Sequence, residues 1–295
     1  MSPSPLSRTA LYAYGILVLV FLYLPLVSVT FASLSESRYL SFPIRSYDAK
    51  WYGEALASDT VNNLLFVSLK VAGLVTIISL VVGFFGALAF ARYQWRFRKT
   101  FQKLILLPIF FPQTVLGLAL LIWFNAIDVI PSWRTAVVAH LVWISPITTL
   151  IISIRAYGFD PTLEEAARDM GCSTWQILRE ITLPLLMPGV VAAGLFAFLL
   201  SWGNFPLSLF TTGADSTLPE WLYAKMVSGY SPLVPTVGIL SVLASVGLLT
   251  LGLGMLFIWR AVRRRRAAVS PALAATKEVE FGAQNPPVSL PATSN

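Results

Sequence analysis

One polar segment of this chain combines acidic, small and turn-forming residues at spacings suited to protein recognition. Its candidate contact residues are Glu164, Glu165, Ala166, Ala167, Met170, Gly171, Cys172, Ile181, Leu183 and Pro184. Glu165 could pair with a basic group of a partner or cap backbone N–H groups there. Ala166 and Ala167 leave a helix face thin, so that another backbone can approach a helix laid in a groove. The chemistry predicted here is therefore protein recognition.

Local signals divide this segment into two short helices. Asp160 is a good N-cap and Pro161 suits the first helical position, which predicts a helix over residues 161–170. Glu164 and Glu165 would then lie near the positive end of the helix dipole. Gly171 supplies a left-handed stop.

A second start signal follows at once. Ser173 and Gln176 have the spacing of a capping box, which predicts another short helix running to Leu183. Pro184 is expected to break this helix before the next apolar run. Between two apolar runs, these helices form a loop over residues 157–186.

The pattern E-A-A-x3-G-x9-I-x-L-P, from Glu165 to Pro184, resembles the signature loop of the membrane subunits of binding-protein-dependent ABC importers. The resemblance covers roughly residues 60–260 and includes Asn62-Asn63-Leu64, Leu107-Pro108 and Pro112. Length and the pair Trp51-Tyr52 make the chain most similar to the second permease of spermidine/putrescine-type importers.

The resemblance implies an all-α membrane protein with the type I ABC importer permease fold and six transmembrane helices. It implies that the helix near Glu165 is a cytoplasmic coupling helix moved by an ATPase. The implied partners are two ATPase subunits, a second, non-identical permease, and a periplasmic or lipid-anchored solute-binding protein. ATP and Mg would bind the ATPase, and this chain would hold no cofactor.

Composition independently predicts a multi-pass membrane protein. Of the 295 residues, 56% are hydrophobic and only 12% are charged, about half the charge of a soluble domain. Each apolar run approaches or exceeds the roughly 20 residues that cross a bilayer as a helix. The expected spans are 11–33, 62–90, 104–126, 135–156, 187–210 and 233–259, with a long outer loop at 34–61.

The positive charges predict the orientation. With the N-terminus inside, 15 of the 21 Lys and Arg residues fall in cytoplasmic segments and five in outer loops. Both ends, residues 1–10 and 260–295, are therefore expected in the cytoplasm of a bacterial inner membrane. The run Arg263–Arg266 fits a contact with lipid headgroups better than a nucleic-acid site. Beyond about residue 267, the Ala-, Pro- and Ser-rich tail is expected to be disordered.

Polar and aromatic groups within the spans are candidates for the solute pathway, because such groups are costly in lipid. They are Phe110, Gln113, Ser201, Trp202, Asn204 and Phe205. The spans contain no Asp or Glu, and amides stand at Gln113 and Asn204, where polyamine permeases often carry acids. A neutral or zwitterionic solute, such as an amino acid derivative, therefore remains an alternative to a polyamine.

The sequence offers little for covalent chemistry. No lysine follows a glycine, so there is no G-K-[ST] phosphate loop, and no H-E-x-x-H or paired-cysteine metal spacing occurs. His140 and Cys172 are the single histidine and cysteine, and both are expected to have packing roles. No catalytic or metal site is predicted. An ion-coupled secondary transporter is a remote alternative, since that class uses intramembrane carboxylates or broken helices.

Overall fold

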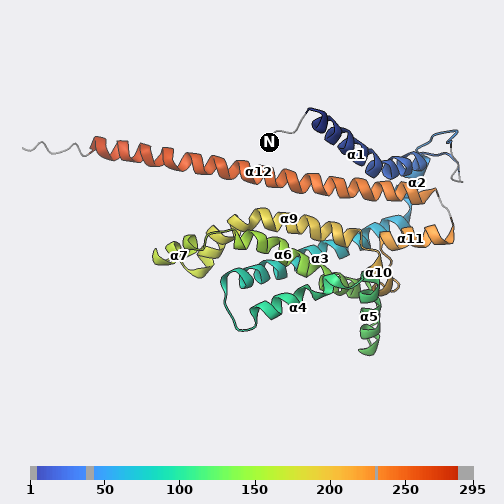
Figure 1. Ribbon diagram of the computed structural model, residues 1–295, viewed down its shortest axis with the longest axis horizontal. Coiled ribbons are helices and arrows are strands. Elements are labelled where there is room, and N and C mark those ends of the chain that lie inside the picture. The colour runs from blue at the N-terminus through green and yellow to red at the C-terminus, as the bar shows by residue number, and fades with distance from the viewer. Residues whose placement is uncertain (1–4, 38–42, 230–231, 285–295) are drawn as a thin grey trace, which may run out of the picture. The chain divides into compact units, whose positions relative to one another are not determined.

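The structure is a computed structural model that describes residues 5–37, 43–229 and 232–284. Apart from one isolated bridge between Ser35 and Tyr47, the regular structure of these residues is helical (Figure 1). The chain divides into two compact units, residues 1–247 and 248–295. Helices suit an apolar surrounding because they satisfy their own backbone groups. The first unit contains the regions discussed below.

Three long helices form the centre of the first unit: α3 (Asp59–Arg92), α6 (Trp133–Tyr157) and α9 (Leu183–Trp202). Small residues let them approach closely, and a Cβ added to Gly83 of α3 would lie 2.7 Å from Thr148 Oγ1 of α6. The Thr148 hydroxyl donates to the Ser79 carbonyl at 3.0 Å. Glycine at a helix contact and a cross-helix hydroxyl bond are typical of membrane bundles.

The N-terminal helix is α1 (Pro5–Ser33), and the expected outer loop contains a further helix, α2 (Lys50–Ala57). The Trp51 indole N–H donates to the Ser35 carbonyl, and the hydroxyls of Ser33 and Tyr52 share a hydrogen bond of 2.7 Å. These contacts connect the end of α1 to α2. The predicted loop is therefore partly ordered by packing that its polar composition does not reveal.

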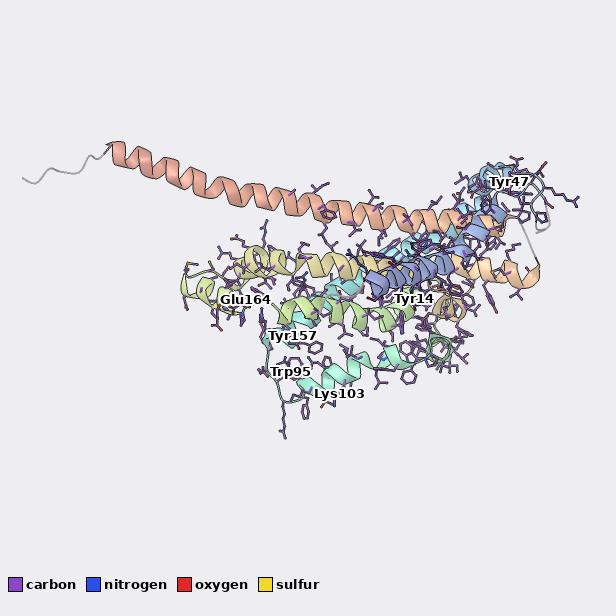
Figure 2. All side chains as sticks on the ribbon, turned by 45° about the horizontal axis from the view of Figure 1, so that its top comes forward. Tyr14, Tyr47, Trp95, Lys103, Tyr157 and Glu164 are labelled. Atoms are coloured by element: carbon purple, nitrogen blue, oxygen red, sulfur yellow. The ribbon has the colours of Figure 1, made fainter. Side chains whose placement is uncertain are left out.

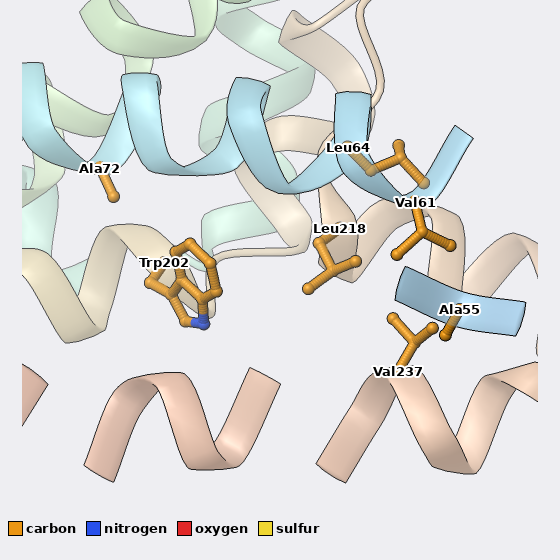
Figure 3. Packing of buried hydrophobic residues seen from close by; sticks show 7 residues of the cluster. All are labelled: Ala55, Val61, Leu64, Ala72, Trp202, Leu218 and Val237. Carbon is orange, nitrogen blue, oxygen red and sulfur yellow. The ribbon is translucent and has the colours of Figure 1, made fainter. Parts of the chain in front are cut away.

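A buried cluster joins α2 to the long helices α3 and α9 (Figure 3). It consists of Ala55, Val61, Leu64, Ala72, Trp202, Leu218 and Val237. Leu218 begins α11 (Leu218–Ser228), and its backbone N–H donates to the Ser68 hydroxyl at 2.7 Å. The segment between Thr211 and Leu233 therefore contains a packed helix.

The expected third span, 104–126, is not one straight helix. It comprises α4 (Arg98–Phe110) and α5 (Gln113–Ala126), which meet at 102°. Pro112 explains the break, since a proline disfavours helical geometry in the residue before it, and Phe111 is extended at φ −79° and ψ 137°. Five described helices are long and apolar enough to span a membrane, or six if this pair counts as one span.

The predicted bounds of the fifth span, 187–210, are wrong at both ends. Its helix is already formed at Thr174, because α8 (Thr174–Ile177), the π-helical turn η1 (Leu178–Thr182) and α9 are continuous. The prediction that Pro184 breaks the helix is therefore wrong. In η1 the hydrogen bonds reach back one residue further, as from the Leu183 N–H to the Leu178 carbonyl, which accommodates a proline at the second position of α9.

At its other end this span stops at Trp202, and a short helix, α10 (Pro206–Thr211), follows. Pro206 begins α10, and the Asn204 side chain accepts the Leu207 N–H at 3.1 Å. An amide that caps a new helix start favours a break here over a continued span.

The last helix is α12 (Leu233–Gln284), whose residues from 248 onward form the second unit. The prediction of disorder beyond about residue 267 is therefore wrong as far as Gln284. Alanine, which favours helix more than any other residue, recurs in residues 267–284, and this local preference outweighs the expectation from composition. Residues 285–295, also predicted to be disordered, lie outside the described part, as do residues 1–4 of the predicted cytoplasmic N-terminus.

Candidate functional site: the coupling loop

The predicted loop over residues 157–186, called the coupling loop after its predicted role, has the turns that its sequence predicts. The first short helix is α7 (Thr162–Asp169), one residue shorter at each end than expected. The Asp160 carboxylate accepts the Thr162 N–H at 3.0 Å. This backbone bond, together with the Thr162 hydroxyl, holds the pKa of Asp160 below its usual value. Asp160 therefore satisfies the first backbone N–H of α7 as an ionised group, but it lies one residue before the N-cap position, which Pro161 occupies instead.

The end of α7 is a Schellman motif. Gly171 has φ +82°, its N–H donates to the Arg168 carbonyl, and the Cys172 N–H donates to the Ala167 carbonyl. The predicted left-handed stop is confirmed. Ser173 and Gln176 then form the predicted capping box, with bonds of 3.3 and 2.8 Å between side chains and backbone N–H groups.

The two faces of α7 differ in what they contact. Glu164 and Ala167, three residues apart, are 7% and 2% exposed, and face the rest of the chain. Leu163, Ala166 and Met170 lie on another face and are exposed. The expectation that Ala166 and Ala167 form one thin face is therefore wrong, because consecutive helical residues point about 100° apart.

The exposed side of the loop is unusually apolar. Met170 is 78% exposed, Trp175 is 67% exposed and Leu163 is 50% exposed, while Glu165 is exposed beside them. The remaining predicted contact residues, Cys172, Ile181, Leu183 and Pro184, are half-buried. Large apolar side chains exposed at a polar loop favour a protein contact.

The buried side of α7 is held by Glu164 (Figure 2). Its Oε2 atom accepts a hydrogen bond of 2.9 Å from Arg92 Nε in an ion pair, and its Oε1 atom accepts one of 2.6 Å from the Thr182 hydroxyl. Arg92 also donates to the Phe159 carbonyl at 3.3 Å. A cavity of about 260 Å³ adjoins these groups, with Arg168 and Thr174 also in its wall.

A second set of polar contacts lies at the same end of the first unit. The Tyr157 hydroxyl donates to the Phe90 carbonyl at 3.0 Å. The same hydroxyl accepts hydrogen bonds from Arg98 and Gln102 of α4 at 3.2 and 2.9 Å. Tyr157 and Glu164, labelled in Figure 2, thus connect the ends of α3, α4, α6 and α7.

The candidate pathway residues fall into two groups. Ser201, Trp202 and Asn204 are buried, and each makes a hydrogen bond within the chain. The Trp202 indole N–H donates to Ser241 at 2.9 Å and its ring stacks on Phe198. Phe205 is half-buried, with its ring 4.3 Å from that of Tyr223. These side chains could meet a solute only if their present contacts rearranged.

Phe110 and Gln113 lie on either side of the bend between α4 and α5. Phe110 is 83% exposed and Gln113 is half-buried. The structure does not bring this pair together with Ser201 and Asn204 through any described hydrogen bond. The pathway role of all six residues stays a prediction.

His140 has the packing role that the sequence suggests. It is 0% exposed, and its Nδ1 and Nε2 atoms lie 2.9 and 3.1 Å from the hydroxyls of Ser201 and Ser208. His140 therefore helps to hold α6 against α9 and α10.

Lys70 also has a partner within the chain, since its Nζ atom lies 3.5 Å from the centre of the Trp133 ring.

A comparison with known protein families identifies the family of this chain. The model of the family described as the binding-protein-dependent transport system inner membrane component matches residues 76–267, well over half of the chain. The chain belongs to this family. The permease is thus a multi-pass inner membrane component of a binding-protein-dependent transport system.

Among curated proteins, the permease is 28% identical over 241 residues to the spermidine/putrescine transport system permease protein PotC of Haemophilus influenzae. The match covers 81% of the permease and 93% of that relative. It is also 28% identical over 236 residues to the putrescine transport system permease protein PotI of Escherichia coli, covering 77% and 83% of the two chains. The predicted resemblance to polyamine-type permeases is confirmed.

A solved structure shows the same fold. The match is to a chain in the crystal structure of a bacterial ABC transporter involved in the import of the acidic polysaccharide alginate, with a TM-score of 0.66 at 14% identity. It covers 85% of the permease and 94% of that chain. The predicted all-α ABC importer permease fold is confirmed.

Three residues of the coupling loop region were not predicted as site residues from the sequence. In the sequence analysis, Arg92 was counted only among the positive charges that predict the orientation. Thr182 was only part of the motif from Glu165 to Pro184, and Trp175 was not considered. Trp175 lies within the capping box, between Ser173 and Gln176, and a large aromatic residue at such an exposed helix start could have been noticed. Nothing in one sequence pairs Arg92 with Glu164, 72 residues away.

Proposed function

We propose that the permease forms half of the translocation pathway of an ATP-driven importer and catalyses no covalent reaction itself. In this proposal it pairs with a second, non-identical permease, two ATPase subunits and a periplasmic or lipid-anchored solute-binding protein. ATP and Mg bind the ATPases, and the permease holds no cofactor. The membership of the permease in a binding-protein-dependent family supports this assembly.

The exposed face of the coupling loop is the observation that carries the proposal. Leu163, Ala166 and Met170 share one side of α7, and Trp175 follows on α8. A short helix with an apolar outer face and fixed turns at both ends suits a hydrophobic groove on another protein. We assign this groove to the ATPase. Because an ATPase that uses cellular ATP is cytoplasmic, the loop and both chain ends are then cytoplasmic as well, in agreement with the charge bias.

For the solute, we propose a polyamine such as putrescine or spermidine. The names of PotC and PotI, which each match most of the permease, support this class. The amides at Gln113 and Asn204 and the absence of Asp and Glu from the six expected spans favour a second candidate, a neutral or zwitterionic solute. A dication without carboxylate partners would have to rely on aromatic faces or on the partner permease.

Reconstituted uptake tests both parts of the proposal. The complex purified through a tag on the permease is placed in proteoliposomes with its binding protein, and radiolabelled putrescine, spermidine and glycine betaine are offered separately. We expect ATPase subunits to copurify with the permease. We expect putrescine or spermidine to accumulate only when ATP is present on the side of the membrane that carries the ATPase subunits. Accumulation of glycine betaine alone would replace the polyamine assignment, and uptake driven by an ion gradient without ATP would reject the importer.

A further inference from the structure

Two consecutive glutamates of α7 have different surroundings. Glu165 is exposed, whereas Glu164 is 7% exposed and uses both carboxylate oxygens within the chain. We propose that Glu164 is a positioning residue: with Arg92 and Thr182 it fastens the coupling helix to the ends of α3, α6 and α9, so that these elements move together. This inference rests on the proposed function, because it assigns a transmission role to a loop that binds an ATPase.

The positions of the partners along their helices support this role. Arg92 is the last residue of α3, and Thr182 is the last residue of η1, immediately before α9. Arg92 also donates to the Phe159 carbonyl and lies with its guanidinium carbon 4.8 Å from the centre of the Phe159 ring. Phe159 follows the end of α6 by two residues. One carboxylate thus connects, directly or through Arg92, with the same end of three helices that pack on one another.

The contact is well protected from water. The Arg92 and Glu164 side chains are 17% and 9% exposed, and the Thr182 residue is 3% exposed. Hydrogen bonds to charged groups at such sites are stronger than those between neutral groups, and a buried ion pair loses much when one partner is removed. A rim contact that water could replace would not transmit a displacement, whereas this contact can.

The segment next to Thr182 suits a point where force enters a span. The π-turn η1 lies between α8 and α9 without interrupting the helix. Such turns occur often at functional sites. If the ATPase displaces α7, the bond from Thr182 to Glu164 makes the start of α9 move with α7. The bond from Arg92 to Glu164 likewise makes the end of α3 move with α7. Loss of both bonds would leave α7 joined to its neighbours by the backbone of its flanking residues and by packing such as that of the buried Ala167.

A distance measurement in the assembled complex separates this role from simple stabilisation. Spin labels are attached at exposed positions 85 of α3 and 169 of α7, in a Cys172→Ser background that removes the single native cysteine. The distance between labels is recorded by pulsed electron resonance, with and without saturating ATP under non-hydrolysing conditions. With Glu164 intact, we expect one distance that ATP leaves unchanged, because α3 and α7 move as one body.

Two variants break the contact without large changes in shape. Thr182→Val removes one hydroxyl, and Glu164→Gln removes the charge. In both we expect ATP to shift or broaden the distance between the labels, while the ATPases still copurify. The matched control is Glu165→Gln, the same change at the exposed neighbour, which should leave the distance independent of ATP.

The inference is overturned if ATP changes the distance in the intact permease, or if Thr182→Val and Glu164→Gln behave like the control. Loss of the ATPases in Glu164→Gln but not in Glu165→Gln would also overturn it, since Glu164 would then be part of the partner contact. If Glu164→Gln is not recovered in the membrane, the milder Thr182→Val decides. Absence of any ATPase from the intact complex would instead reject the proposed function.

Discussion

Gly171→Val is expected to leave the permease inserted in the membrane and to weaken its association with the ATPase by a factor of about 5–30. Gly171 has φ +82°, a conformation that costs a residue with a Cβ roughly 1–2 kcal/mol, which corresponds to that factor. No atom lies within 4 Å of an added Cβ, so the effect comes from the backbone rather than from a clash. Relief of the strain would undo the bonds from the Gly171 and Cys172 N–H groups to α7 and change the position of Met170 relative to Trp175.

Gly171→Asn is the matched control for this variant. Asparagine tolerates the left-handed conformation better than any β-branched residue, so it should retain most of the association. The measurement is the amount of ATPase that copurifies with equal amounts of membrane-inserted permease. Equal recovery with valine and asparagine would show that the turn does not position the contact face.

Gly83→Leu is expected to destabilise the permease itself. An added Cβ at Gly83 would lie 2.7 Å from Thr148 Oγ1 and 3.0 Å from the Thr149 backbone nitrogen, so α3 and α6 would have to separate. Overpacking of this kind costs typically 1–3 kcal/mol, and here it also threatens the bond from Thr148 to the Ser79 carbonyl. We expect a lower midpoint of thermal unfolding and less monodisperse complex in detergent.

Gly73→Leu provides the comparison on the same helix, because nothing lies within 4 Å of a Cβ added there. It should unfold close to the temperature of the unaltered permease. If both leucine variants lost the same stability, the cost would belong to glycine replacement in α3 in general, and the close contact between α3 and α6 would not be its cause.

Local signals in the sequence predicted the coupling loop well. Asp160, Gly171 and the pair Ser173 and Gln176 each act on backbone groups within a few residues, and each makes the predicted bond. These are short-range interactions that do not depend on the rest of the fold. For the same reason, the bounds of α7 were predicted to within one residue at each end.

Prolines show where the sequence was insufficient. Pro112 and Pro206 stand at breaks, whereas Pro184, predicted to break a helix, follows η1 and is accommodated. Pro25, Pro108 and Pro146 lie inside helices. The outcome at each proline depends on which neighbour satisfies the freed backbone carbonyl, and that neighbour is fixed by tertiary packing.

The sequence also could not predict which side chains of the coupling loop are buried against the rest of the chain. Glu164 and Glu165 are identical in type and adjacent, and only the positions of Arg92 and Thr182 decide that Glu164 is buried. Likewise, Trp202 and Asn204 looked like pathway residues because polar groups in spans are rare. Their partners, Ser241 and the Leu207 N–H, show that they also have structural roles.

A crosslink from position 166 tests the central claim, that the exposed face of α7 contacts a cytoplasmic ATPase. Ala166 is exposed between Leu163 and Met170, so Ala166→Cys in a Cys172→Ser background presents one thiol on that face. With a short reagent that joins this thiol to an amine of a neighbouring protein, we expect a permease–ATPase product in inside-out vesicles and in the purified complex. A crosslink only to the solute-binding protein, or modification of position 166 from the outer side of intact cells, would contradict both the partner and the orientation.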